Sequence, residues 1–133
     1  MKKILLDTNA YSSFRFGDKT ILSALGAAET IYLSVFVIGE LLVGFAGGKR
    51  NKENRIQLEE FKSKQTVKVL FATEETAQVF ASIKNALKRA GTPIPSNDLW
   101  IAAHALETGS AMVTFDKYFT FVPGLRIVDL GRE

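Results

Sequence analysis

The stretch "ILLDTN", residues 4–9, places an acid directly after a short run of apolar residues. Lys3–Leu6 has the length and composition of a buried strand, and Asp7 follows at its end. Four more short segments have strand composition: "TIYLS" (30–34), "TVKVLF" (66–71), "AMVTF" (111–115) and "LRIVDL" (125–130). In "TVKVLF", Val67, Val69 and Phe71 alternate and are predicted to share one face.

Helical patterns separate these strands. "DKTILSALGAAE" has Asp18 as a predicted N-cap, and "TEETAQVFASIKNALKRAG" combines acids in its first turn with a stopping Gly91. The other predicted helices span Val35–Ala46, residues 51–64 and Asp98–Glu107. Val35–Ala46 is apolar on all sides, so we expect it to be buried. Strands alternating with helices predict an α/β fold with a mainly parallel sheet and helices on both faces.

The composition favours one globular domain over residues 1–133. Hydrophobic residues make up 47% of the chain and charged residues 23%, and the net charge of +3 permits a polyanionic partner without requiring one. The absence of cysteine excludes disulfides and thiolate metal sites. The first apolar run stops at Leu6, too early for an export signal, and residues 31–47 are interrupted by Glu40, so we expect a cytoplasmic protein with no membrane partner.

Four carboxylates stand in unusual positions. Asp7 and Asp116 each follow a predicted strand directly, at the sheet edge where α/β proteins bind ligands. Glu40 and Asp98 lie on apolar helices, with no lysine or arginine within one helical turn of either. A buried carboxylate is costly without a partner, so each helix acid needs an ion pair from a distant segment or a bound cation.

A shared cation is the hypothesis that covers all four acids, because a divalent ion relieves the repulsion between gathered carboxylates. Oxygen ligands without cysteine, and with a single histidine in the chain, favour Mg²⁺ or Mn²⁺ over Zn²⁺. Singly, each acid has a simpler interpretation. Asp98 could complement the dipole of its helix, and Asp7 and Asp116 could be turn residues.

At these positions the chain resembles a known family. "LLDTNAY", "SVFVIGELLVG", "PSNDLWIAAHAL" and "VTFDKYF" resemble, in order and spacing, the motifs of the PIN domain, and more narrowly those of VapC-type toxins of bacterial and archaeal toxin–antitoxin pairs. The resemblance runs from Lys3 to Val128. It implies a three-layer α/β/α fold around a sheet of about five strands, and a Mg²⁺- or Mn²⁺-dependent endoribonuclease. It also implies a homodimer and a cognate VapB-type antitoxin that blocks the acidic site.

Residue by residue, the resemblance maps the family's catalytic, metal-binding acids onto Asp7, Glu40 and Asp98, with Asp116 as a more variable fourth. Polar companions that could orient ligands or water map onto Thr8, Asn9, Ser34, Asn97 and Thr114. Ser34 could equally be the N-cap of the Glu40 helix, and Thr114 an ordinary strand residue. Lys49 and Arg50 could grip RNA phosphates, although cations after a helix are usually solvated.

The chemistry of such a site predicts hydrolysis of RNA to 5′-phosphate and 3′-hydroxyl ends, because a metal-activated water needs no attack by the 2′-hydroxyl. His104 is the lone histidine and is predicted to face away from Asp98, which makes a structural role the simpler one. Trp100 and Tyr118 flank the acids and could stack on a base or belong to the core.

Other phosphate-handling enzymes fit less well. Haloacid-dehalogenase-type enzymes need an acid where this chain has Asn9, receiver domains need an acidic pair that is not evident, and a P-loop would need other residues than Val43 and Arg50. A non-catalytic PIN-like domain that binds RNA or a protein is the remaining alternative, although the presence of all four acids favours an enzyme.

Overall fold

The computed structural model describes residues 2–131 and contains a five-stranded parallel sheet. The strands follow the order β3-β2-β1-β4-β5, so the first strand of the chain lies in the middle of the sheet. In register, Leu6 of β1 stands beside Leu33 of β2 and Val113 of β4. The strands are β1 (Lys3–Leu6), β2 (Thr30–Ser34), β3 (Val67–Leu70), β4 (Ala111–Val113) and β5 (Arg126–Ile127).

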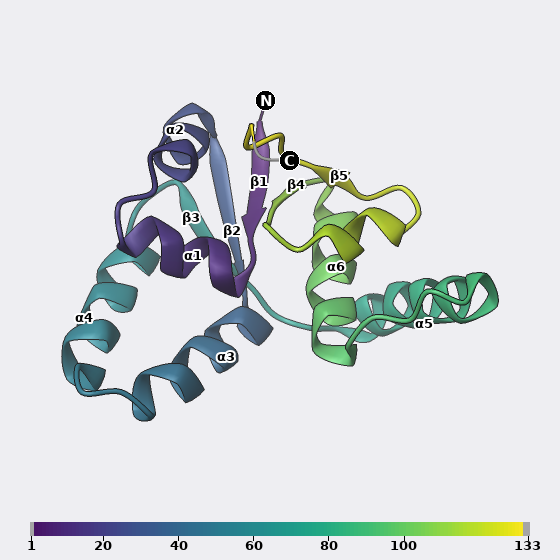
Figure 1. The fold of residues 1–133 in the computed structure, drawn as a ribbon, viewed down its shortest axis with the longest axis horizontal. Coiled ribbons are helices and arrows are strands. Elements are labelled where there is room, and N and C mark those ends of the chain that lie inside the picture. The colour runs from purple at the N-terminus through teal and green to yellow at the C-terminus, as the bar shows by residue number, and fades with distance from the viewer. Residues whose placement is uncertain (1, 132–133) are drawn as a thin grey trace.

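Helices cover both faces of this sheet, as predicted. In Figure 1, α1, α2 and α4 lie on one side of the strands and α5 and α6 on the other, while α3 lies near the carboxyl end of β2. The helices are α1 (Thr8–Arg15), α2 (Lys19–Ala27), α3 (Val35–Ala46), α4 (Asn51–Lys62), α5 (Glu74–Ala90), α6 (Ser96–Thr108) and the 3₁₀ helix η1 (Lys117–Phe121). The three-layer α/β/α architecture is therefore confirmed.

Local signals in the sequence explain several helix ends. The Asp18 side chain accepts hydrogen bonds from the first turn of α2, which confirms it as the N-cap. Thr73 and Thr76 form a reciprocal capping box at the start of α5. That helix ends at Gly91, whose φ of +74° lies in the left-handed region that glycine adopts without strain.

The predicted interior position of α3 is wrong. Val37 and Leu41 are buried, but Glu40 is exposed and Val43 is 77% exposed. The helix is apolar all round, yet only one stripe of it meets the rest of the chain. The reasoning that made Glu40 a buried carboxylate therefore fails, and its place beside the other acids requires a separate explanation.

The sequence analysis does not predict the helices α1 and η1, and three strands, β3, β4 and β5, are shorter than predicted. The polar run "TNAYSSFR" forms α1 because Asp7 caps it and because Ala10 and Tyr11 face the core. Strand β4 ends at Val113, before the predicted Thr114 and Phe115, and β5 covers only the first part of "LRIVDL". In β3, Val67 is buried as predicted, but Phe71 lies beyond the strand and is 70% exposed.

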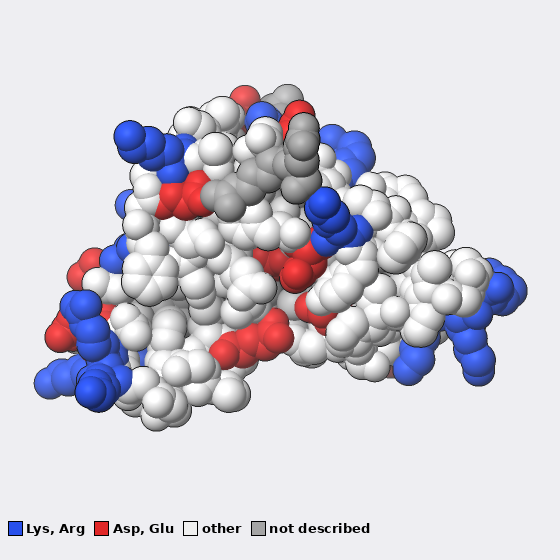
Figure 2. Space-filling model, viewed as in Figure 1, with Lys and Arg blue, Asp and Glu red and all other residues white. Residues whose placement is uncertain are grey.

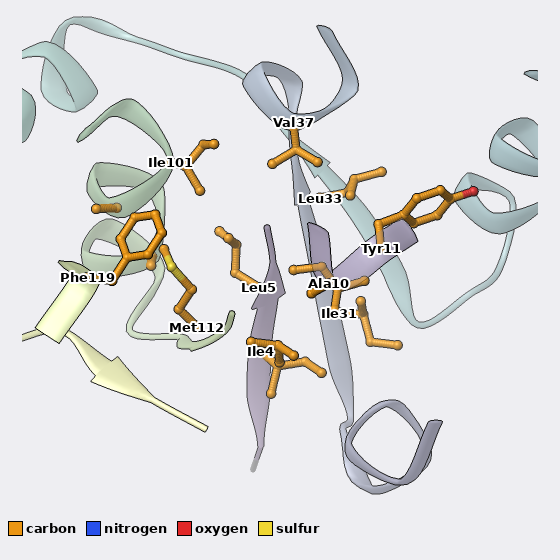
Figure 3. Packing of buried hydrophobic residues seen from close by; sticks show 14 of the residues in the cluster. Ile4, Leu5, Ala10, Tyr11, Ile31, Leu33, Val37, Ile101, Met112 and Phe119 are labelled. Atoms are coloured by element: carbon orange, nitrogen blue, oxygen red, sulfur yellow. The ribbon is translucent and has the colours of Figure 1, made fainter. Parts of the chain in front are cut away.

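The core is centred on β1. Ile4, Leu5 and Leu6 are fully buried, and Figure 3 shows side chains from both flanking layers converging on this strand. Burial of a strand on both faces explains why the sequence reads as a continuous apolar run. Within residues 2–131, no helix combines the length and the apolar character needed to span a bilayer.

Candidate active site

Asp7 lies at the carboxyl end of the central strand and begins α1. Its Oδ1 accepts a hydrogen bond of 2.8 Å from the backbone N–H of Ala10, and its Oδ2 accepts one from the hydroxyl of Thr114. The side chain is 4% exposed. The pKa of Asp7 is raised from 3.8 to about 6, mainly because the carboxyl is buried. The two hydrogen bonds lower the pKa, and the charges of Asp116 and Asp98 raise it by a smaller amount.

Asp98 lies in the first turn of α6, whose helix begins two residues earlier than predicted, at Ser96. Its Oδ2 accepts a hydrogen bond of 2.5 Å from the phenolic hydroxyl of Tyr118 in η1. Burial raises the pKa of Asp98, and the charges of Glu40 and Asp116 raise it further, while the bond from Tyr118 lowers it. Partial burial and the same contact with Asp98 raise the pKa of Tyr118, so the phenol keeps its proton.

Glu40 projects from the exposed side of α3 and is held by the first turn of α1. The hydroxyl of Thr8 donates a 2.5 Å hydrogen bond to its Oε1. Because Thr8 directly follows Asp7, this bond joins the segment after the central strand to α3. Thr8 therefore contacts an acid, as a residue that orients ligands would.

Thr114 joins the first and last acids. It donates its hydroxyl proton to Asp7, and its oxygen accepts a 3.0 Å hydrogen bond from the backbone N–H of Asp116. This arrangement ends β4 early, because the chain turns after Val113 to direct Thr114 toward β1. The prediction that Thr114 is a companion of the acids agrees with these contacts.

The four acids form one electrostatic group, which we call the acidic cluster: Asp7, Glu40, Asp98 and Asp116. Asp7 is affected by Asp98 and Asp116, and Asp98 by Glu40 and Asp116. Figure 2 shows acidic side chains near the centre of the face seen in Figure 1, with most lysine and arginine side chains toward its edges. The ion pairs Arg50–Glu53 and Lys62–Glu59 involve other carboxylates, and within residues 2–131 no cluster acid is paired with a cation.

The donor chemistry of the acidic cluster fits a hard divalent cation, since its ligand atoms are carboxylate oxygens. Their positions are not a closed ligand set: within residues 2–131, no three Asp, Glu or His side chains stand ready to hold one ion. Three of the carboxylates are instead held by hydroxyl groups of the chain: Thr8 bonds Glu40, Thr114 bonds Asp7 and Tyr118 bonds Asp98.

Ser34 and His104 form a buried structural link beside the cluster. The Ser34 hydroxyl accepts from the backbone N–H of Phe36, which makes Ser34 the N-cap of α3, and it lies 2.9 Å from Nδ1 of His104. Nε2 of His104 lies 3.2 Å from the carbonyl oxygen of Phe71, which can only accept, so Nε2 carries the proton and Nδ1 accepts from Ser34. Burial lowers the pKa of His104, which favours this neutral form.

The other predicted site residues have fewer contacts. Asn9 is exposed, and Asn97 is half-buried and lines a shallow depression with Glu40. Lys49 is exposed between α3 and α4, and Arg50 is paired with Glu53. Trp100 is stacked between Phe36 and Phe80, at 5.3 and 4.0 Å between ring centroids, so its faces are occupied by the protein.

The hydrogen bond between Tyr118 and Asp98 is the site contact that the sequence did not reveal. The sequence allows Tyr118 to stack on a base or to belong to the core, whereas in the structure its hydroxyl bonds directly to Asp98. A tyrosine two residues after a candidate acid was the available signal, but the unpredicted turn of η1 is what directs it toward α6.

Comparison with known proteins agrees with this fold. The sequence model of the family described as PIN domain matches residues 4–125, and the chain belongs to that family. Among its relatives are VapC-type proteins. Ribonuclease VapC1 of Haemophilus influenzae strain R2866 is 34% identical over 109 residues, which cover 81% of this chain and 80% of the relative. Ribonuclease VapC2 of Rickettsia felis is 29% identical over 126 residues, covering 91% and 92%.

Solved structures give the same result. The structure of VapBC-1 from nontypeable Haemophilus influenzae superposes with a TM-score of 0.85 at 27% identity, over 98% of this chain and 99% of the other. DNA-bound VapBC from Salmonella typhimurium superposes with a TM-score of 0.83 at 28% identity, with the same coverage. The resemblance that the motifs indicated is confirmed, and the protein is a VapC-type member of the PIN domain family.

Proposed function

We propose that this protein is a Mg²⁺- or Mn²⁺-dependent endoribonuclease and the toxin of a VapBC-type pair, leaving 5′-phosphate and 3′-hydroxyl ends. The observation that carries the proposal is the convergence of the acidic cluster from distant parts of the chain, with no cation partner within residues 2–131. Such a group is costly in isolation and is suited to binding a hard dication. Relatives named ribonucleases support the activity.

Asp7, Asp98, Glu40 and Asp116 are the residues that would hold the cation. A bound dication would supply charge stabilisation at the scissile phosphate and a more acidic water. The chain's own contribution is to hold the carboxylates. Thr114 orients Asp7, Tyr118 orients Asp98 and Thr8 orients Glu40, each through a hydroxyl that donates to one carboxylate oxygen. The other oxygen of Asp7 accepts from the backbone N–H of Ala10.

His104 supports hydrolysis without a histidine base. Both of its ring nitrogens are engaged, by Ser34 and by the carbonyl of Phe71, and its side chain is 2% exposed. An imidazole in that position has no access to an RNA 2′-hydroxyl. Cleavage that leaves a 2′,3′-cyclic phosphate commonly relies on a pair of histidines as acid and base, so such ends are not expected here.

The proposed protein partner is inferred from the solved structures of related proteins. The structures of VapBC proteins support a VapB-type antitoxin as partner, and we propose in addition a homodimer that acts on RNA in the cytoplasm. The mild positive charge of the chain is compatible with an RNA substrate.

The test is cleavage of total RNA by the purified protein with Mn²⁺ or with EDTA, compared with Asp7→Asn and Asp98→Asn. Both variants should fold and should lose more activity than the ~10–100-fold typical of outer-shell changes. Ligation of adaptors to the fragments identifies 5′-phosphate ends. RNA binding without metal-dependent cleavage would instead support the non-catalytic alternative.

A further inference from the structure

A pocket opens beside the acidic cluster, between α1, α3 and α4. Its volume is about 300 Å³, and Thr8 and Glu40, the pair that joins α1 to α3, form part of its wall. We call it the lateral pocket. Any group bound in the lateral pocket lies next to the acidic cluster. An RNA whose scissile phosphate is held at the acids would therefore reach the pocket with a neighbouring nucleotide.

Polar groups without partners line this pocket. The side-chain amides of Asn54 and Gln57 on α4 are half-buried, and neither makes a hydrogen bond within residues 2–131. The hydroxyl of Tyr11 is buried and has no hydrogen-bond partner in the same part of the chain. A buried unsatisfied hydroxyl is uncommon and costs free energy, so its place in a pocket wall points to a ligand.

The apolar part of the wall is mostly aromatic, with Leu41 as its aliphatic member. Phe45 contributes a ring, and Phe16, which follows α1, is 92% exposed at the edge, whereas the ring of Tyr11 packs against Phe61 at 5.3 Å between centroids. Figure 3 shows the ring of Tyr11 directed away from the central strands, with its hydroxyl at the outer end. Arg15, also in the wall, is exposed and adds a positive charge. The side chains that line the lateral pocket therefore differ from those of an aliphatic groove, which would offer a ligand neither amides nor a charge.

These features match the chemistry of a nucleotide. Bases stack on aromatic rings in a way that tolerates any sequence, amide side chains pair with base edges, and arginine binds phosphate. We propose that the lateral pocket binds a base of the RNA substrate adjacent to the scissile phosphate, with Asn54 and Gln57 reading its edge. The inference rests on the proposed ribonuclease function and adds to it a residue-level basis for base preference.

The first test measures binding and needs no cleavage. The four nucleoside 5′-monophosphates are titrated into the protein in EDTA, and the side-chain amide signals of Asn54 and Gln57 are followed by NMR. One base should shift both signals. Asn54→Ala and Gln57→Ala should weaken that binding about tenfold, the size expected for loss of a base-edge contact. Tyr11→Phe should weaken binding without lowering the melting temperature, because it removes a hydroxyl that is unsatisfied in the free protein.

The second test measures specificity. Short RNAs that differ in the base beside the cleavage site are compared as substrates, with Gln78→Ala, an exposed amide on α5, as the matched control. Gln57→Ala should reduce the preference between bases about tenfold, while Gln78→Ala should leave it unchanged. An unchanged preference in Gln57→Ala, together with unshifted amide signals, would overturn the inference.

The two tests separate this inference from the proposed function. If the wild-type protein cleaves no RNA, the ribonuclease proposal fails, and the titration alone then decides whether the pocket binds a base. If the Asn54 and Gln57 signals respond to the antitoxin but to no nucleotide or RNA, the lateral pocket is a protein-docking site and the inference is wrong.

Discussion

Replacing Asp7 with asparagine should make the protein more stable at neutral pH while removing its activity. The carboxyl has a pKa of about 6 in the folded chain against 3.8 ordinarily, and burial is the main cause. At 1.36 kcal/mol per pKa unit, ionised Asp7 costs the folded state about 3 kcal/mol. Asparagine is neutral, can accept from the Ala10 N–H through its oxygen and can donate to Thr114 through its amide, so the local hydrogen bonds are retained.

The pH dependence has a definite sign. Because the folded pKa is raised, the contribution of Asp7 to stability is complete below pH 3.8 and is lost as the pH rises through about 6. The free energy of unfolding of Asp7→Asn should therefore equal that of the wild type at pH 4 and exceed it by about 3 kcal/mol at pH 7.5. This difference corresponds to a rise in melting temperature on the order of 10 °C. His104 has the opposite effect on stability. Because its pKa is lowered, the folded protein loses stability when the pH falls below 6.5. His104 is present in both proteins, so this effect cancels when their free energies of unfolding are compared.

Urea denaturation followed by circular dichroism, in EDTA at pH values from 4 to 7.5, measures this difference. Asp129→Asn, which changes an exposed carboxylate, is the matched control and should show no such trend. Addition of Mn²⁺ should stabilise the wild type more than the variant, by mass action. A variant that is less stable than the wild type at pH 7.5, or a difference that does not change with pH, would refute the reasoning.

Three further substitutions test other contacts. Tyr118→Phe keeps the ring but removes the hydroxyl that holds Asp98; Mn²⁺ affinity at pH 7, measured by calorimetry, should fall at least about tenfold, and unchanged affinity would exclude an orienting role. Ser34→Ala removes a helix cap and leaves Nδ1 of His104 buried without a donor, so unfolding in urea should show a loss of about 2 kcal/mol. Gly109→Ala places a side chain at φ +68° with nothing within 4 Å of the new Cβ; the melting temperature should drop by the equivalent of about 1 kcal/mol from backbone strain alone, and no drop would contradict that.

The sheet and three of the acids could be predicted because their signals are local. A continuous apolar run such as Lys3–Leu6 indicates a strand buried on both faces, and an acid at its end falls at the edge of the sheet. Asp116 is indicated in the same way by its place after a strand, whereas Asp98 is indicated by its place on an apolar helix with no lysine or arginine within one turn. The structure brings these positions together through the parallel order of the strands.

Glu40 was selected for a reason that the structure contradicts. Its neighbours in sequence are apolar, but α3 presents the carboxylate on its exposed side, and proximity to Asp98 and the bond from Thr8 bring it into the cluster. Apolar residues on a helix do not reveal which of its faces meets another element. The bond from Tyr118 to Asp98 depends on a 3₁₀ turn with no periodic signature, so no pattern in the sequence could predict it.

The central position of β1 has a consequence for how the nascent polypeptide folds. Among the five strands of the sheet, β1 is made first, but one of its two sheet neighbours, β4, and the hydroxyl that holds Asp7 lie more than a hundred residues later, with Thr114 separated from Asp7 by 107 positions. During synthesis, Asp7 must therefore wait for Thr114 before the acids can be assembled. A polypeptide whose synthesis stops before α6 lacks Asp98 and Asp116, so it carries only two of the four acids that the proposed activity needs.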